Sequence, residues 1–219
     1  MKLLGRLLSA FGLALIAAVL FGIVAWLIGD DRISGFDSDI ISAVQGAEAP
    51  GLTSLAEGLT WFGRTLPVTV FSIAIMIALY FFLRHRWELL LFAVVMLGST
   101  TLNKVLKAVF HRERPNIHRL AEEAGFSFPS GHAMAAFALY GILAYLLWRH
   151  VNSVVGRVLL VLVCAAMFLG IGWSRIYLGV HYPSDVLGGY LASGVWLLLS
   201  IAVYQRWTKR RRAAGRTTS

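Results

Sequence analysis

The chain has 219 residues, of which 58% are hydrophobic and only 14% are charged, and its formal net charge at pH 7 is +9. A typical soluble domain is about half apolar and about one quarter charged, so this composition excludes an ordinary soluble globular protein. With a mean hydropathy of +0.72, the chain is predicted to lie in a membrane.

Long apolar runs follow one another along the chain. A helix needs about 20 apolar residues to cross about 30 Å of hydrocarbon. Six stretches meet or approach this length, at residues 7–28, 66–83, 88–106, 131–148, 156–174 and 185–205. The first could be a cleaved signal peptide, but its apolar core exceeds the usual length of about 7–15 residues for such a segment. We therefore predict an all-α membrane bundle of six transmembrane helices, forming one domain over residues 1–219 with a basic tail at 207–219.

The segment between the first two spans, residues 29–65, carries six acidic residues and is expected on the outer side. Within it, Phe36, Ile40, Ile41 and Val44 recur at helical spacing, which predicts a short amphipathic helix on the membrane surface. Its role is either to guide a lipid or to cover the bundle, and covering is favoured.

Basic residues concentrate on one predicted side of the membrane. With the N-terminus inside, the inside segments hold Lys2, Arg6, Arg84, Arg86, Arg149, Arg157, Arg206, Lys209, Arg210, Arg211, Arg212 and Arg216. This bias places both termini in the cytoplasm, and a basic tail suits an anionic leaflet. The expected partner is therefore the lipid bilayer, and neither a nucleic acid nor an obligatory protein partner is predicted.

Three polar groups lie at the predicted outer ends of spans three to six. The groups are Lys107 with Arg114-Pro115, then Pro129-Ser130-Gly131-His132, then Ser174-Arg175 followed by His181 and Asp185. Because all three fall at one membrane face, segments that are distant in sequence could converge on one site.

The residue types of these groups suit a phosphate. Ser130 can cap the fourth span, whose free backbone N–H groups then form an anion site, and Gly131 allows the backbone to approach oxygen atoms closely. Lys107 ends the third span, and a cation is favourable at a helix C-terminus. Arg114 and Arg175 add planar forks that can bind phosphate oxygens in pairs.

Two histidines extend the chemistry beyond binding. Asp185 follows His181 by four residues across a helix start, so its carboxylate could hold one ring nitrogen and leave the other to attack phosphorus. His132 could act as the general acid on the leaving oxygen. No Asp, Glu or His spacing is typical of a metal site, so neither a metal nor another cofactor is expected.

Taken together, these residues resemble the type 2 phosphatidic acid phosphatase superfamily, which also includes the vanadium haloperoxidases. Its signature is Lys-x6-Arg-Pro, then Pro-Ser-Gly-His, then Ser-Arg-x5-His-x3-Asp, and the sequence matches every signature position in order. The resemblance implies a set of phosphate-binding residues, namely Lys107, Arg114, Ser130, Gly131 and Arg175. It also implies the acid His132, the nucleophile His181 and its orienting partner Asp185.

Within that superfamily the chain looks like the compact bacterial lipid phosphatases. The resemblance implies a lipid phosphohydrolase of the bacterial cytoplasmic membrane with its active site outside, acting through a phosphohistidine. The implied substrates are phosphatidylglycerophosphate, undecaprenyl pyrophosphate and phosphatidic acid. A lipid-linked phosphotransferase, a transporter and a soluble-substrate haloperoxidase are the alternatives.

Three further residues are secondary candidates beside this site. Arg112 is the best candidate for binding a second phosphate. Asn103 and Lys104 could contact a lipid headgroup, although a hydrogen bond between helices is an equal alternative for Asn103.

Overall fold

The computed structural model describes residues 2–83, 86–116 and 118–216, and these are helical or irregular with no strand. The elements are α1 (Lys2–Gly29), α2 (Ser34–Gln45), α3 (Pro50–Gly63), α4 (Thr65–Ala78) with a π-helical turn (Leu79–Leu83), α5 (Arg86–Phe110), α6 (Gly131–Leu147), α7 (Val154–Tyr177) and α8 (Pro183–Arg216). Every one of the six apolar stretches predicted from the sequence coincides with a helix.

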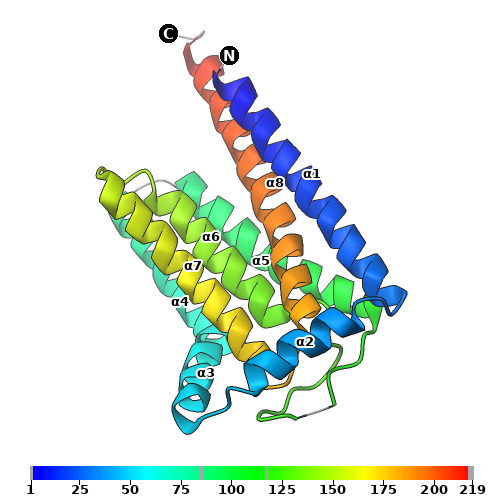
Figure 1. Cartoon of the computed structure of the whole chain (residues 1–219). Helices are drawn as coiled ribbons and strands as arrows, with labels where there is room; N and C mark the ends of the chain where they lie inside the picture. The colour runs from blue at the N-terminus through cyan, green and yellow to red at the C-terminus, as the bar shows by residue number, and fades with distance from the viewer. Residues whose placement is uncertain (1, 84–85, 117, 217–219) are drawn as a thin grey trace.

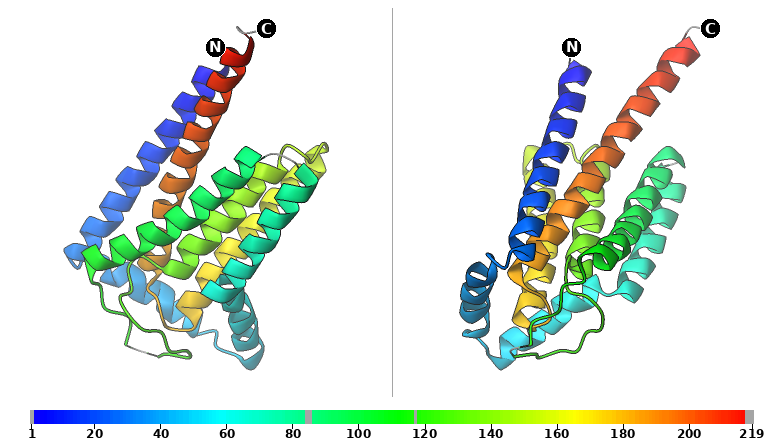
Figure 2. Two further views of the ribbon diagram at one scale, coloured as in Figure 1. Left: turned by 180° about the vertical axis from the view of Figure 1, so that it is seen from behind. Right: turned by 90° about the vertical axis from the view of Figure 1, so that its right-hand side faces the viewer.

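The helices α4 to α7 run side by side, and α1 packs along α8 (Figures 1 and 2). The two ends of the described chain lie at the same end of the bundle. The helices α2 and α3 and the long loop after α5 lie at the opposite end, as all views show. The predicted polar groups therefore gather at the end away from the termini.

Length and composition identify four helices that could cross a membrane, in α1, α5, α7 and α8. Helices α3 and α4 meet at a bend of 54° and would add a fifth span as a pair. Helix α6 has 17 residues, or about 26 Å at a rise of about 1.5 Å per residue, which is shorter than the hydrocarbon layer. The described residues thus provide four or five spans by this criterion, where the sequence predicted six.

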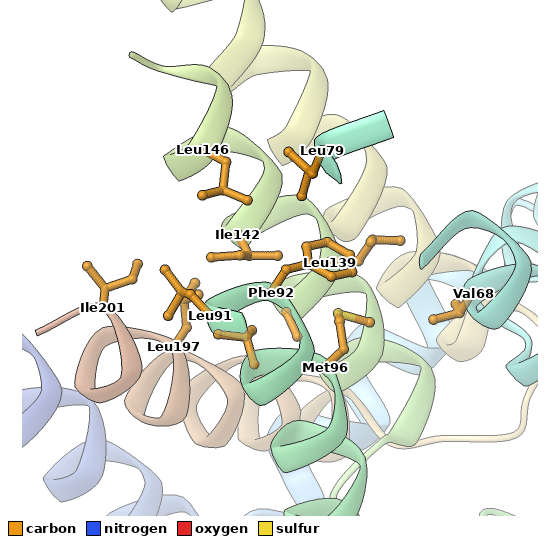
Figure 3. Close-up of a cluster of buried hydrophobic side chains, with 12 residues drawn as sticks. Val68, Leu79, Leu91, Phe92, Met96, Leu139, Ile142, Leu146, Leu197 and Ile201 are labelled. Carbon is orange, nitrogen blue, oxygen red and sulfur yellow. The ribbon is translucent and has the colours of Figure 1, made fainter. Parts of the chain in front are cut away.

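A cluster of buried side chains joins α4, its π-helical turn, α5, α6 and α8 (Figure 3). Phe92 of α5 and Ile142 of α6 are fully buried in it, and Leu197 of α8 closes one side. Burying a large apolar side chain stabilises the fold by about 1.5–3 kcal/mol. The short helix α6 is therefore held at the centre of the bundle, where its length need not match the bilayer.

The predicted amphipathic helix is α2, and its apolar face packs inward. Ile41 lies in a buried cluster with Ala133, Ile176 and Val186, at the starts of α6 and α8 and the end of α7. Helix α2 therefore covers the polar end of the bundle, and α3, which the sequence did not predict, packs against α7 at the same end.

The predicted basic tail continues α8 as far as Arg216, and residues 217–219 of it lie outside the described residues. Trp207 packs edge to face against Trp87 of α5, and the Arg211 guanidinium lies over both rings. Arg84, counted among the basic inside residues, also lies outside the described residues.

Candidate active site

Helix termini place the predicted residues at one end of the bundle. Lys107 lies in the last turn of α5 and Arg175 in the last turn of α7. Ser130 caps α6, because its Oγ accepts a hydrogen bond from the Ala133 N–H at 3.4 Å. Helix α8 begins at Pro183 and has Asp185 in its first turn. These local placements are the ones predicted from the sequence.

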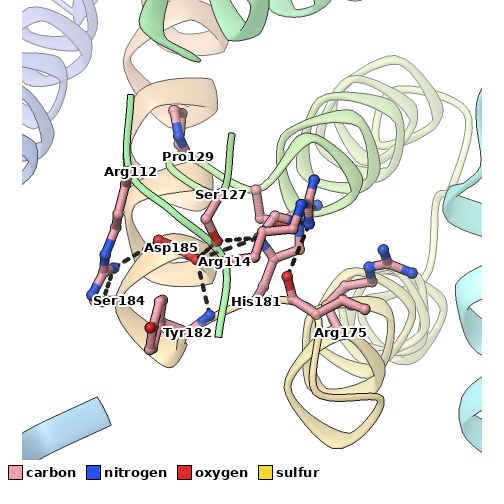
Figure 4. A network of polar contacts seen from close by, with 12 residues as sticks. Arg112, Arg114, Ser127, Pro129, Arg175, His181, Tyr182, Ser184 and Asp185 are labelled. Atoms are coloured by element: carbon pink, nitrogen blue, oxygen red, sulfur yellow. Dashed lines mark hydrogen bonds and ion pairs between the residues drawn. The ribbon is translucent and has the colours of Figure 1, made fainter. Parts of the chain in front are cut away.

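The His181 imidazole is held from one side by Asp185 (Figure 4). The Nδ1 atom lies 3.3 Å from Asp185 Oδ2, and the same oxygen accepts the Tyr182 N–H at 2.9 Å and the Ser127 hydroxyl. With Nδ1–H as the donor, Nε2 carries the lone pair. Burial lowers the pKa of His181 to about 4, so the imidazole is neutral near pH 7, which is the form a nucleophile needs.

Cationic side chains surround the Nε2 atom of His181. Arg114 Nη1 donates to Nε2 at 3.2 Å and to the Val180 carbonyl at 2.9 Å. Lys107 Nζ and Arg114 Nη2 both donate to the Phe126 carbonyl, at 2.6 and 3.3 Å. Burial lowers the pKa of Arg114, but a guanidinium stays charged in proteins. The structure therefore brings Lys107, Arg114 and His181 together.

Arg175 and His132 pack against α3, one turn apart. Arg175 Nη1 donates to Thr60 Oγ1 at 2.6 Å, and its Nη2 is paired with Glu123. A side chain at Gly63 would lie 2.9 Å from the His132 ring. Among the described residues, Arg175 Nε and His132 Nε2 are buried without a hydrogen-bond partner. Such atoms cost about 1–3 kcal/mol each, which is understandable where a polar ligand binds.

The segment before α6 is tied to both neighbouring helices. Ser130 N–H donates to the Asp185 carbonyl at 3.0 Å, and Asn103 Nδ2 donates to the Pro129 carbonyl at 3.0 Å. The space left by Gly131 holds the Asn103 amide, whose Oδ1 would lie 3.0 Å from an added Cβ. Of the two predictions for Asn103, hydrogen bonding between elements is the one these contacts support. Lys104 lies exposed on α5.

Arg112, the secondary candidate for a second phosphate, is paired with two carboxylates. Its Nη1 donates to Asp185 Oδ1 at 2.7 Å and its Nη2 to Asp37 Oδ2 at 2.8 Å. Two carboxylates thus occupy the guanidinium that was expected to bind a second phosphate, and a phosphate would have to compete with both.

Sequence reasoning missed four residues of this site, namely Asp37, Thr60, Glu123 and Ser127. One of them left a usable signal. Asp37 lies four residues before Ile41, so an acidic residue shares the apolar face of an amphipathic helix. Such a carboxylate needs a buried partner, and the structure provides Arg112. The others approach the site through loop and helix packing that no local pattern encodes.

The chemistry open to this arrangement is that of a phosphate. Three cations and two helix starts can bind phosphate oxygens, while the neutral His181 imidazole presents Nε2 among them, beside the Arg114 guanidinium. The described residues hold no group of three or more His, Cys, Asp or Glu side chains that could bind a metal ion.

Known proteins are similar to this chain in sequence and fold. Residues 88–209 match the model of the PAP2 superfamily. Phosphatidylglycerophosphatase B of Bacillus subtilis (strain 168) is 35% identical, over 87% of this chain and 93% of that protein. An undecaprenyl-diphosphatase of Sulfolobus acidocaldarius is 26% identical, over 88% and 90% of the two chains. The crystal structure of a transmembrane PAP2 type phosphatidylglycerolphosphate phosphatase from Bacillus subtilis superposes with a TM-score of 0.80 at 29% identity, covering 90% of this chain and 96% of that one.

Proposed function

This chain belongs to the PAP2 superfamily and is a membrane lipid phosphatase, and we propose that it hydrolyses phosphatidylglycerophosphate through a phosphohistidine on His181. The observation that carries the mechanism is the environment of this ring. Asp185 lies 3.3 Å from Nδ1, and the Arg114 guanidinium lies 3.2 Å from Nε2. The phosphatidylglycerophosphatase relative, which matches nearly end to end, supports the choice of substrate.

The reaction would proceed in two displacements. His181 Nε2 attacks phosphorus, the bond from phosphorus to the lipid oxygen breaks, and that oxygen takes a proton from His132. Water then attacks the phosphohistidine, the phosphorus–nitrogen bond breaks, and His132 takes the proton that water loses. Lys107, Arg114 and Arg175 would stabilise the negative charge on the phosphoryl oxygens in both transition states.

The loop after α5 contacts the cations that would bind the substrate phosphate. The Phe126 carbonyl now accepts from Lys107 and Arg114, and the Glu123 carboxylate pairs with Arg175. These loop oxygens stand where phosphate oxygens would bind the same cations. Substrate binding would therefore exchange loop contacts for phosphate contacts.

We place the site outside a bacterial cytoplasmic membrane, with six spans and cytoplasmic termini. The short helix α6 would act as the fourth span, because it is buried within the bundle, and α4 with its π-helical turn would act as the second. Both termini lie at the end opposite the site (Figure 1), and the basic residues of the sequence favour a cytoplasmic position for that end.

Undecaprenyl diphosphate is the second candidate substrate, because relatives that match most of this chain are named for that activity. Phosphatidic acid is the third, from the family resemblance. A phosphotransferase would use the same phosphohistidine and pass it to an alcohol. A transporter is disfavoured, because the site's charges gather at one end of the bundle and not near its middle.

Phosphate release by the purified protein in detergent tests the proposal, with the three lipids compared side by side. His181→Ala should abolish release, and His150→Ala, exposed at the far end of the bundle, should leave it unchanged. Lys107→Ala should mainly weaken substrate capture. Losing one preorganised charge contact costs about 2.7–4 kcal/mol, a loss of about a hundred- to a thousandfold. Orthovanadate should inhibit, since it mimics the five-coordinate phosphoryl state.

Near-normal release by His181→Ala would remove His181 as the nucleophile. Preference for a different lipid would change the substrate and leave the mechanism standing. Release that requires an added alcohol would identify a phosphotransferase.

A further inference from the structure

Arg112 and Asp37 lie outside the residues that the proposed mechanism uses, yet both are bound into the site. We propose that they form a positioning pair that holds the Asp185 carboxylate in the orientation that His181 needs. This inference rests on the proposed roles of His181 and Asp185. It also assigns a function to the surface helix α2, which lies outside the part of the chain matched by the family model.

The two oxygens of Asp185 have different partners. Oδ2 faces His181 Nδ1 and also accepts the Tyr182 N–H and the Ser127 hydroxyl. Oδ1 accepts from Arg112 Nη1 at 2.7 Å. A carboxylate turns readily about its Cβ–Cγ bond, because that torsion is broad. The bond to Oδ1 therefore opposes a rotation that would take Oδ2 away from the imidazole.

Arg112 is itself held on several sides. Its Nη1 also donates to Ser184 Oγ at 2.7 Å, and its Nη2 donates to Asp37 Oδ2 at 2.8 Å. The guanidinium lies over the Tyr182 ring, 4.0 Å from the centroid. The Arg112 side chain is only 15% exposed, so these contacts are shielded from water. Its orientation is set before any substrate arrives.

Asp37 completes a closed circuit of contacts. Its carboxylate accepts from the Ser184 N–H at 2.9 Å and the Ser184 hydroxyl at 2.6 Å, in addition to Arg112. Asp37 is 1% exposed, and a buried carboxylate without such partners would cost several kcal/mol. The circuit fixes both the start of α8, through Ser184, and the guanidinium that holds Asp185.

The charges explain why two carboxylates flank one cation. When His181 takes up phosphorus its ring becomes positive, and Asp185 must remain negative to stabilise it. A lone guanidinium on Oδ1 would draw the Asp185 charge away from the ring. Asp37 shares the Arg112 cation, so Asp185 is oriented while it keeps charge for His181. Without Arg112, two buried carboxylates would lie close together, and like charges disfavour ionisation of both.

The test compares Arg112→Gln, Arg112→Lys and Asp37→Asn with Asp39→Asn, a matched control on the exposed face of α2. Phosphate release from the preferred lipid gives kcat and KM, and thermal unfolding in detergent reports folding. Arg112→Gln and Asp37→Asn should lower kcat about 10- to 100-fold, a loss of about 1.4–2.7 kcal/mol, and leave KM within about threefold. Lysine should restore only part of kcat, because a single ammonium cannot reproduce the planar fork.

A double variant separates positioning from a general loss of structure. If Arg112 acts through Asp185, then adding Arg112→Gln to Asp185→Asn should lower kcat by no more than about twofold further. A full additional loss would overturn the proposal, and so would folded Arg112→Gln and Asp37→Asn variants with wild-type kcat. If Arg112→Gln does not fold, Arg112→Lys and Asp37→Asn decide by the same criteria. Failure of the proposed function would be visible separately, because His181→Ala protein would still release phosphate from the lipid.

Discussion

Replacing Asp185 with asparagine is expected to slow phosphate release by about 10³- to 10⁴-fold, by analogy with the loss seen when the carboxylate of a Ser-His-Asp triad becomes an amide. The Asp185 carboxylate accepts four hydrogen bonds, from Arg112 on one oxygen and from Tyr182 N–H, Ser127 and His181 on the other. An amide has one oxygen and one NH2 group, so it can satisfy only one side of this arrangement.

Either orientation of the amide damages the site. If the NH2 group faces His181, Nδ1 must become the acceptor and Nε2 carries the proton, so its lone pair is unavailable for attack. If the oxygen faces His181, the NH2 group opposes the Arg112 guanidinium, and one charge-assisted hydrogen bond of about 1.5–3 kcal/mol is lost. The first orientation removes the nucleophile. The second destabilises the fold, whose total free energy of unfolding is typically only about 5–15 kcal/mol.

Phosphate release measured with radiolabelled lipid would give kcat over the required range, and thermal unfolding in detergent would show whether the variant folds. A folded Asp185→Asn variant with kcat within threefold of wild type would refute the assignment of Asp185 as the partner that sets the tautomer of His181. A raised KM with an unchanged kcat would point to a binding role instead.

Three further changes probe the same site. Burial lowers the pKa of His181 from its ordinary value of 6.5 to about 4. As the pH is lowered, kcat/KM corrected for ionisation of the substrate should therefore show no loss with a midpoint near pH 6.5. A midpoint near pH 6.5 that belongs to His181 would contradict this. Between about pH 4 and 6.5 the unfolded chain binds more protons at this residue than the folded chain, so resistance to thermal unfolding should rise with pH through that window. Glu123→Gln removes the carboxylate that competes for Arg175, so KM should fall by up to about fivefold, as expected for a partly exposed ion pair of about 1 kcal/mol; an unchanged or raised KM would count against this competition. Gly179→Ala should lower the unfolding temperature more than Gly125→Ala. Both residues have positive φ, at 70° and 75°, but only at Gly179 would an added Cβ collide with a backbone oxygen, that of His118. Equal losses would contradict the steric argument.

The sequence predicted the helices well where the signal was local. Each long apolar run became a helix, and the Ser130 cap and the Pro183 start lie where their chemistry placed them. Helix α3 was missed, because it lies within a polar connection and forms a bent pair with α4. Helix α6 ends within one residue of its predicted end, and burial inside the bundle frees it from the length that a lipid-exposed span requires.

The carboxylate partners of Arg112 were not predicted for a related reason. A basic residue beside a phosphate motif resembles a further phosphate ligand when only neighbours in the sequence are considered. Its partner Asp37 lies 75 residues away along the chain, on a helix whose orientation depends on packing. The pairing of Glu123 with Arg175 is likewise set by the path of a loop.

The sequence by itself determined that this chain is a helical membrane protein with phosphate chemistry, because hydrophobic length, helix capping and the spacing of His181 and Asp185 act over one or two turns. Only the tertiary structure decided which oxygen atoms accept hydrogen bonds from the cationic side chains and which residues hold Asp185. Those contacts join α2, α8 and the loop after α5, and they depend on how buried charges find partners when separate segments pack together.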